Sequence, residues 1–325
     1  MPVFRITAVV VLCGRFRTED KYERLSDIVF LSKDLSHKRG SNMKKKTKIY
    51  LAVFAVCAAL GAAAGIFAFD KIVNGPIKPI EPVSISTYDV SDFSDVCLIG
   101  HRGFSAVAPE NTLISFEKAC TCGFYGCEFD IHLTSDGEWV IMHDPQIKRM
   151  TSRRGVIEKM TLDSLKSIPL TNGANIEKYG EIFMPTLEEA LCLLNKYNVI
   201  PVIEIKTNTT EKLDDVLSLI EKYGFSESAW IISFNKESLV RIRELDERIN
   251  ISLLTERVSR RALSFCTRNK LNGLDFNKDK AGEKQVKMIL DAGLIPQAWT
   301  VDRAEDFERF YSFGVRYFTG NCLTY

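Results

Sequence analysis

Residues 98–144 read LIGHRGFSAVAPENTLISFEKACTCGFYGCEFDIHLTSDGEWVIMHD, and the rest of the 325-residue chain is best understood from them. They contain three of the four histidines of the protein, together with several carboxylates. Acid–base groups and ligands for hard cations are therefore concentrated in one short segment. These residues are His101, His132, His143, Glu110, Glu128 and Asp130.

Two predicted strands are each followed by a histidine in a loop. Residues 96–100 form an apolar run that ends in glycine, which predicts a buried strand followed by His101 and Arg102. Histidine exchanges a proton near neutral pH, and arginine offers a planar fork that suits phosphate oxygens. Residues 139–142 form a second apolar strand after a turn, and His143 follows it.

The strand predicted over 127–133 carries a pair of acidic side chains. Its period of two places Glu128 and Asp130 on one face, with His132 beyond them. Two carboxylates on one face repel each other unless a positive charge lies between them, and oxygen ligands suit Mg²⁺ or Ca²⁺. The alternative is a solvated strand edge, since acidic residues usually face water.

Several ordered blocks resemble the glycerophosphodiester phosphodiesterase family over about residues 95–325. The resemblance depends on the order and spacing of many blocks, which is more specific than one short motif. The blocks are HRG (101–103), ENT (110–112), EFD (128–130), HD (143–144), MPTLEEAL (184–191), IEIK (203–206), AWTVD (298–302) and GVRYFTGN (314–321).

The resemblance implies a TIM-type barrel, a divalent cation (Ca²⁺ or Mg²⁺) and hydrolysis of glycerophosphodiesters to sn-glycerol 3-phosphate and an alcohol. It also implies a role for each matching residue. Trp299 either forms an apolar wall for glycerol or packs in the barrel. The implied site consists of the acid–base pair His101 and His143, the phosphate contacts Arg102 and Lys206, the pocket residue Trp299, and the metal ligands Glu128, Asp130 and Glu204.

The chain departs from the family pattern at two places. Asp302 stands where the family tends to have asparagine, and Thr319-Gly320 stands where a Thr-Asp pair is usual. Neither position holds an implied ligand, so we expect these departures to affect the substrate pocket more than catalysis.

The second half of the chain alternates between strand-like and helix-like segments. Repeated strand–helix units with short connections predict an α/β fold with parallel strands, and their number favours a closed TIM-type (β/α)8 barrel over a doubly wound open sheet. A small insertion is expected after the second strand region, at about 145–183, with basic side chains that either meet an anionic substrate or are solvated.

The amino-terminal part predicts a membrane segment ahead of the catalytic barrel at 95–325. Residues 1–42 read as an upstream extension, non-native or disordered, with translation starting at Met43. Residues 43–70 combine lysines with an apolar run and predict a transmembrane anchor or a cleaved signal peptide. The proline-rich linker 71–94 then separates the barrel from the membrane. The lysines indicate a single-pass cell-membrane protein with an extracytoplasmic barrel, secreted if the segment is cleaved.

Composition narrows the possible partners. The formal net charge of +1 and the lack of a basic stripe argue against a nucleic-acid partner and favour a small-molecule glycerophosphodiester. The alternatives are a lysophospholipase-D-like activity on lysolipids and a membrane-tethered binding protein without turnover. The sequence leaves the oligomeric state open.

Overall fold

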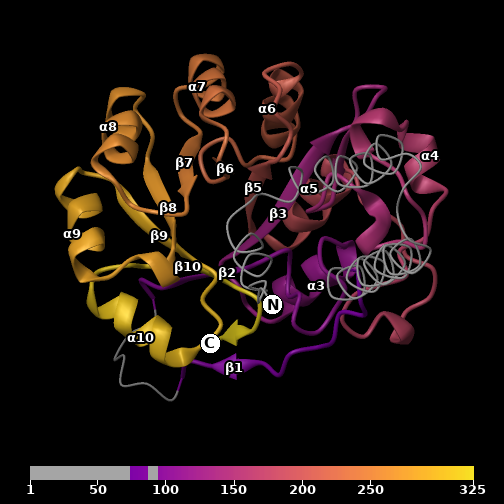
Figure 1. The fold of residues 1–325 in the computed structure, drawn as a ribbon, viewed down its shortest axis with the longest axis horizontal. Coiled ribbons are helices and arrows are strands. Elements are labelled where there is room, and N and C mark those ends of the chain that lie inside the picture. Colours follow the sequence, from indigo (N-terminus) through magenta and orange to yellow (C-terminus); the bar gives the residue numbers. More distant parts are fainter. Residues whose placement is uncertain (1–73, 87–93) are drawn as a thin grey trace, which may run out of the picture. The chain divides into compact units, whose positions relative to one another are not determined.

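Eight parallel strands close into a barrel in the described residues, 74–86 and 94–325 of a computed structural model (Figure 1). Each strand pairs with the next around the ring, and β2 pairs with both β3 and β10, which closes it. This closure confirms the predicted TIM-type barrel and excludes the doubly wound open sheet. The barrel strands are β2 (Cys97–Gly100), β3 (Gly126–Leu133), β5 (Ile200–Ile205), β6 (Trp230–Ser233), β7 (Asn250–Thr255), β8 (Gly273–Asn277), β9 (Ile295–Trp299) and β10 (Tyr317–Gly320).

Helices connect the strands and form the outer layer (Figure 1). Side-chain oxygens cap several of them: Thr112 and Thr186, for example, accept hydrogen bonds from backbone N–H groups of the first turn. Their alternation with the strands agrees with the predicted strand–helix repeat of the second half of the chain. The helices are α3 (Leu113–Thr121), α5 (Leu187–Tyr197), α6 (Leu213–Lys222), α7 (Lys236–Leu245), α8 (Arg260–Arg268), α9 (Glu283–Asp291) and α10 (Ala304–Ser312).

The alternation of side chains along each strand divides the core in two. In β3, Phe129 and Ile131 belong to the large apolar cluster between strands and helices. Glu128 and Asp130 therefore point to the opposite side, into the barrel. A smaller cluster that includes Ile99, Val202 and Trp230 fills the interior. Because all barrel strands run in the same direction, their carboxyl ends meet at one end of the barrel.

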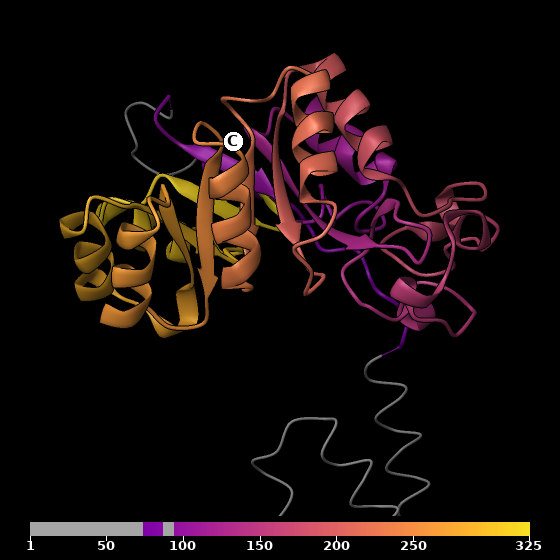
Figure 2. The ribbon, with the colours of Figure 1, turned by 90° about the horizontal axis from the view of Figure 1, so that it is seen from above.

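The segment between β3 and α5 departs from the simple strand–helix repeat. β4 (Trp139–Ile141) pairs antiparallel with β3, and a run of short turns with α4 (Leu162–Lys166) follows. This run buries apolar side chains of its own, including Ile147, Ile157 and Leu165. Figures 1 and 2 place it on the side of the barrel opposite α8 and α9.

Part of the predicted linker packs on the barrel. β1 (Val83–Ser84) pairs in parallel with β11 (Leu323–Thr324), and Ile85 is fully buried. Residues 74–86 are thus not a free tether, because their backbone and apolar side chains find partners on the barrel. The predicted extension 1–42 and the predicted anchor 43–70 lie outside the described residues. Within the described ranges, no helix has both the length and the apolar character needed to cross a bilayer.

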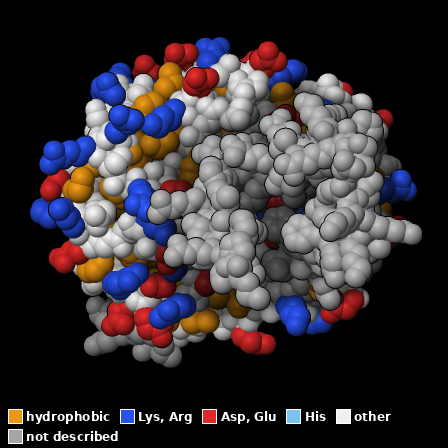
Figure 3. All heavy atoms as spheres, viewed as in Figure 1, with side chains coloured by type: hydrophobic (Ala, Val, Ile, Leu, Met, Phe, Trp, Pro, Cys, Tyr) orange, Lys and Arg blue, Asp and Glu red, His pale blue; other side chains and the backbone are white. Residues whose placement is uncertain are grey.

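The outer surface carries charges of both signs. On the coloured part of the face in Figure 3, Lys and Arg side chains alternate with Asp and Glu side chains around the rim. This mixture agrees with a formal net charge of +1.

Candidate active site

Three carboxylates from two adjacent strands meet inside the barrel. Glu128 and Asp130 lie on β3, Glu204 lies on β5, and the strand register pairs Asp130 directly with Glu204. One oxygen of each carboxylate lies within 4.8 Å of the others. Their exposed fractions are 2%, 1% and 9%, respectively. The expected meeting of these three side chains is therefore observed.

Two cationic side chains border the acidic group. Lys206, just after β5, places Nζ 3.0 Å from Glu204 Oε1 and 3.4 Å from Asp130 Oδ1. Arg102 places Nε 3.6 Å from Asp130 Oδ2. Burial would raise the pKa of Asp130, but Arg102, His143 and Lys206 hold it below its usual range. Burial and the charge of Asp130 raise the pKa of Glu204 to about 8.

The acidic group fits a divalent cation. In the part of the chain that the structure describes, Asp130 Oδ1 has no hydrogen-bond partner although it is buried. With every carboxyl group ionised and the histidines neutral, the ion-paired side chains around it carry a formal net charge of −2. These are the carboxylates Glu110, Glu128, Asp130, Asp144 and Glu204 and the cations Arg102, Arg149 and Lys206. Oxygen ligands with this charge suit Ca²⁺ or Mg²⁺.

The loop after β2 is built around Glu128. The backbone N–H of Arg102 donates a hydrogen bond of 2.8 Å to Glu128 Oε2. Arg102 has φ 56° and Gly103 has φ 79°, so the chain turns in the left-handed region. A Cβ at Gly103 would lie 2.4 Å from Ser115 Oγ, which explains the glycine of the HRG block.

His101 is held by two contacts beside this loop. Its Nδ1 lies 2.7 Å from Asn321 Oδ1, and its Nε2 lies 4.0 Å from Glu128 Oε2. Burial and the neighbouring charge of Arg102 lower the pKa of His101 to about 4. Asn321 in turn is bound to Asp302. The family departure at Asp302 therefore lies next to the partner of His101, and its expected effect on the substrate pocket remains a prediction.

The second implied acid–base residue follows β4. His143 Nδ1 lies 2.7 Å from Asp144 Oδ1, and the other oxygen of Asp144 accepts a hydrogen bond of 2.5 Å from Arg149 Nε. His132 Nε2 lies 3.3 Å from the backbone oxygen of His143. His132 therefore supports the loop and does not belong to the acidic group.

Supporting residues around the site were only partly visible in the sequence. Asn111 of the ENT block donates a hydrogen bond of 2.8 Å to Asp130 Oδ2. Glu110 accepts hydrogen bonds from Arg102 and Arg149, so it orients the loop that contains Arg102. In the sequence, the ENT block indicated both Glu110 and Asn111. Asn321 was indicated only by its place in the closing block GVRYFTGN.

Trp299 packs against another aromatic side chain. It ends β9, and its ring packs edge-on against that of Phe234, with centroids 5.9 Å apart. Phe234 is 47% exposed and follows β6, so this aromatic pair also lies at the carboxyl ends of the strands.

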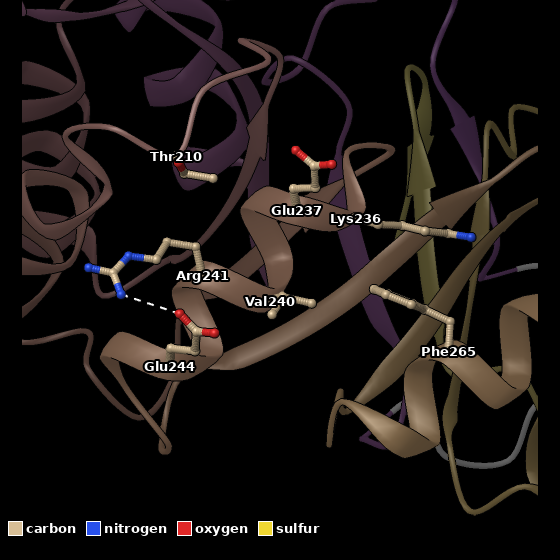
Figure 4. Close-up of a pocket in the computed structure, with 7 residues that line it drawn as sticks. All are labelled: Thr210, Lys236, Glu237, Val240, Arg241, Glu244 and Phe265. Carbon is tan, nitrogen blue, oxygen red and sulfur yellow. Dashed lines mark hydrogen bonds and ion pairs between the residues drawn. The ribbon is translucent and has the colours of Figure 1, made fainter.

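A hollow in the outer layer is a separate feature (Figure 4). It lies between α7 and α8, where Lys236 passes over the ring of Phe265 and Arg241 pairs with Glu244. None of its lining residues belongs to the acidic group. The barrel interior therefore remains the candidate active site.

Comparisons with known proteins agree with this assignment. Residues 101–320 match the profile of the glycerophosphoryl diester phosphodiesterase family. A glycerophosphodiester phosphodiesterase of Caldanaerobacter subterraneus is 32% identical over 228 residues, covering 67% of this chain and 90% of the relative. The structure of an Oleispira antarctica phosphodiesterase in complex with the product sn-glycerol-3-phosphate has a TM-score of 0.65 and 25% identity, covering 74% and 96% of the two chains. A glycerophosphodiester phosphodiesterase structure from Parabacteroides distasonis has a TM-score of 0.58 and 26% identity, covering 70% and 93%.

Proposed function

The chain belongs to the glycerophosphoryl diester phosphodiesterase family, and on this premise we propose that it hydrolyses glycerophosphodiesters to sn-glycerol 3-phosphate and an alcohol in a reaction that depends on a divalent cation. The relative named above carries this activity in its name, and the Oleispira structure contains the same product. The substrates would be the deacylated headgroups of phospholipids.

The proposed dependence on a cation is inferred from the buried acidic group. Glu128, Asp130 and Glu204 would hold the ion, since their carboxylates converge and Asp130 Oδ1 has a free lone pair. When bound, Ca²⁺ or Mg²⁺ supplies charge neutralisation for the nonbridging phosphate oxygens. Without a cation, three buried carboxylates this close together would repel one another strongly.

Arg102 and Lys206 are the proposed contacts to the phosphate. The hydrogen bond that the structure gives the Arg102 side chain uses Nη1, so other N–H groups of its guanidinium remain to donate. Lys206 has an ammonium with three donors beside Glu204 and Asp130. The side chains of Arg102 and Lys206 therefore lie beside the proposed metal site, where a phosphodiester would bind.

The hydrogen bonds of the two histidines suggest which one is the base. Nδ1 of His101 faces an amide oxygen, whereas Nδ1 of His143 faces the carboxylate of Asp144. Both partners accept, so each Nδ1 carries a proton and each Nε2 is available. A carboxylate stabilises an imidazolium more than an amide oxygen does. We therefore assign His143 to protonate the leaving oxygen and His101 to remove the proton of the nucleophile.

The nucleophile is either water or the neighbouring glycerol hydroxyl. Attack by the hydroxyl forms a cyclic phosphate, which water then opens, whereas direct attack by water forms none. Following the reaction by ³¹P NMR distinguishes them, because only the first route shows a cyclic phosphate signal.

The test of the proposed function is choline release from glycerophosphocholine by the full chain. We expect EDTA to abolish release and Ca²⁺ or Mg²⁺ to restore it. Glu128→Gln should prevent the restoration. Glu188→Gln is the matched control, because Glu188 pairs with Lys222 on the outer helices. If no glycerophosphodiester releases its alcohol in a metal-dependent way, the protein is a binding protein on the same barrel.

Lysolipids are a second candidate substrate class, favoured by one observation. Phe234 is exposed at the carboxyl ends of the strands beside Trp299, which offers an apolar surface near the site. Release of choline from lysophosphatidylcholine at a rate comparable to that from glycerophosphocholine would support this activity.

A further inference from the structure

Hydrogen bonds connect His101, through Asn321, to the carboxylate of Asp302. His101 Nδ1 lies 2.7 Å from Asn321 Oδ1. Asn321 donates to Asp302 twice, from its backbone N–H to Oδ1 at 2.6 Å and from Nδ2 to Oδ2 at 2.7 Å. Asp302 follows β9 and Asn321 follows β10, so two adjacent strands deliver this pair to the site.

The two loops are fastened together where the pair forms. Val301 donates a backbone hydrogen bond of 2.9 Å to the oxygen of Thr319. A Cβ at Gly320 would lie 2.2 Å from the backbone oxygen of Val301, so only glycine allows this close approach. The oxygen of Gly320 also accepts a hydrogen bond of 2.8 Å from the backbone N–H of His101. The positions of all three loops are therefore linked.

The carboxylate fixes the orientation of the amide. An ionised carboxylate only accepts hydrogen bonds, so Nδ2 of Asn321 must face Asp302 and Oδ1 must face His101. Ser105 Oγ donates to the same Oδ1 at 3.0 Å, which agrees with this orientation. Because Oδ1 only accepts, Nδ1 of His101 must carry the proton. The lone pair of the neutral imidazole is then on Nε2, the nitrogen nearer Glu128.

We propose that Asp302 is a positioning residue that, through Asn321, selects the His101 tautomer whose Nε2 can accept a proton. This inference deepens the proposed function and rests on the role of His101 as the base. Asp302 itself does not touch the reacting atoms. Its effect is to exclude the flipped amide, which would place Nδ2 against His101 and require the proton on Nε2.

The substitution Asp302→Asn tests this selection. The new amide offers one acceptor and one donor group, so it cannot accept from both N–H groups of Asn321. The Asn321 side chain can then flip and donate to His101. We expect kcat to fall by about 10²-fold, the lower end of the contribution of a positioned acid–base group, with little change in KM.

The reciprocal exchange Asp302→Asn with Asn321→Asp provides a rescue. A carboxylate at position 321 accepts from His101 Nδ1 and from the amide at position 302, whose oxygen accepts the backbone N–H of residue 321. The double variant should recover kcat, but only at a higher pH than the wild type, because the carboxylate at position 321 stabilises the imidazolium of His101 and raises its pKa. A purely structural role for Asp302 would not predict recovery from exchanging the two groups.

The tautomer itself can be measured. In ¹⁵N-labelled full chain with Mg²⁺, the ¹⁵N shifts of His101 separate the protonated from the unprotonated ring nitrogen, and the chain has only four histidines to assign. We expect the proton on Nδ1 in the wild type and in the double variant, and on Nε2 in Asp302→Asn. Repeating the measurement after chelation gives a result that does not depend on activity.

Two controls separate the possible failures. Asp246→Asn is matched, since Asp246 also accepts a backbone hydrogen bond, from Arg248 at 2.7 Å, but lies at the end of α7 in the outer layer. It should leave kcat unchanged. If the wild type releases no alcohol from a glycerophosphodiester, the proposed function is wrong. If His101→Ala stays active, the role of His101 as the base is wrong, and with it the role of Asp302. If His101→Ala is inactive but Asp302→Asn keeps both its kcat and the wild-type tautomer, only the role of Asp302 is overturned.

Discussion

The guanidinium of Arg149 forms two hydrogen bonds with the carboxylate of Glu110, at 2.7 Å and 3.1 Å. Its Nε also donates to Asp144, which holds His143, while Glu110 accepts from Arg102 as well. Only 15% of the Arg149 side chain is exposed. This arginine of the insertion is thus neither a solvated charge nor a free contact for substrate. It connects the support of His143 with that of Arg102.

Replacing Arg149 by lysine should therefore impair catalysis. Lysine keeps the charge but cannot donate to Glu110 and Asp144 in the same planar geometry. A hydrogen bond to a charged group contributes about 1.5–3 kcal/mol, so we expect kcat/KM for glycerophosphocholine to fall by about 10- to 100-fold. Arg153→Lys, an exposed position in the same segment, is the control. Equal kcat/KM values for the two variants would show that the connection has no catalytic effect.

The parts of the site that follow strand periodicity could be predicted from the sequence. The period of two placed Glu128 and Asp130 on one face, whereas only the family resemblance implied that Glu204 joins them; in the structure Glu204 pairs with Asp130 in the strand register. The contact between His101 and Asn321 joins residues 220 positions apart, and no local pattern encodes it. It depends on closure of the ring, which places β10 beside β2. Arg149 lies in an irregular segment, where neither helical nor strand periodicity predicts the direction of a side chain.

Cation binding should stabilise the folded protein through the acidic group. A ligand present at 100 times its Kd adds about 2.7 kcal/mol of stability, which corresponds to roughly 5–10 °C in Tm for a domain of this size. Differential scanning fluorimetry of the chelated full chain with added Ca²⁺ or Mg²⁺ measures this shift.

Glu204→Gln should reduce the shift, because one of three oxygen ligands loses its charge. Burial and Asp130 raise the pKa of Glu204 to about 8, so without cation the neutral glutamine should be no less stable at pH 8 than the wild type. Glu188→Gln should leave the shift intact. A full cation shift in Glu204→Gln would place the ion elsewhere.

The aromatic pair at the barrel mouth should affect substrate affinity. The rings of Phe234 and Trp299 pack edge to face, an arrangement that contributes about 0.5–1.5 kcal/mol. If the pair forms the apolar wall of the pocket, Phe234→Ala should raise KM for glycerophosphocholine by about two- to tenfold, with a smaller effect on kcat. Leu290→Ala, another exposed apolar position, is the control. An unchanged KM would mean that Trp299 only packs in the barrel.

Asp275 should make stability depend on pH through a buried carboxyl group that is not part of the acidic group. It lies on β8, is 2% exposed, and its Oδ1 has no hydrogen-bond partner among the described residues. Burial raises its pKa from 3.8 to about 8. Between these values the folded state binds more protons than the unfolded state, so the stability that this group contributes is present at low pH and falls as the pH rises towards 8.

Asp275→Asn removes this titration while keeping the shape of the side chain. The variant should gain stability relative to the wild type as the pH rises, with the Tm difference smallest near pH 5 and several degrees larger at pH 8, since one pKa unit corresponds to about 1.4 kcal/mol. Melting curves of chelated protein from pH 5 to pH 9 measure the slope. An unfavourable contact of the new amide would lower Tm by the same amount at every pH. It would therefore not make the Tm difference between variant and wild type depend on pH. A pH-independent Tm difference would show that the Asp275 carboxylate is charged in the folded barrel and has a partner there.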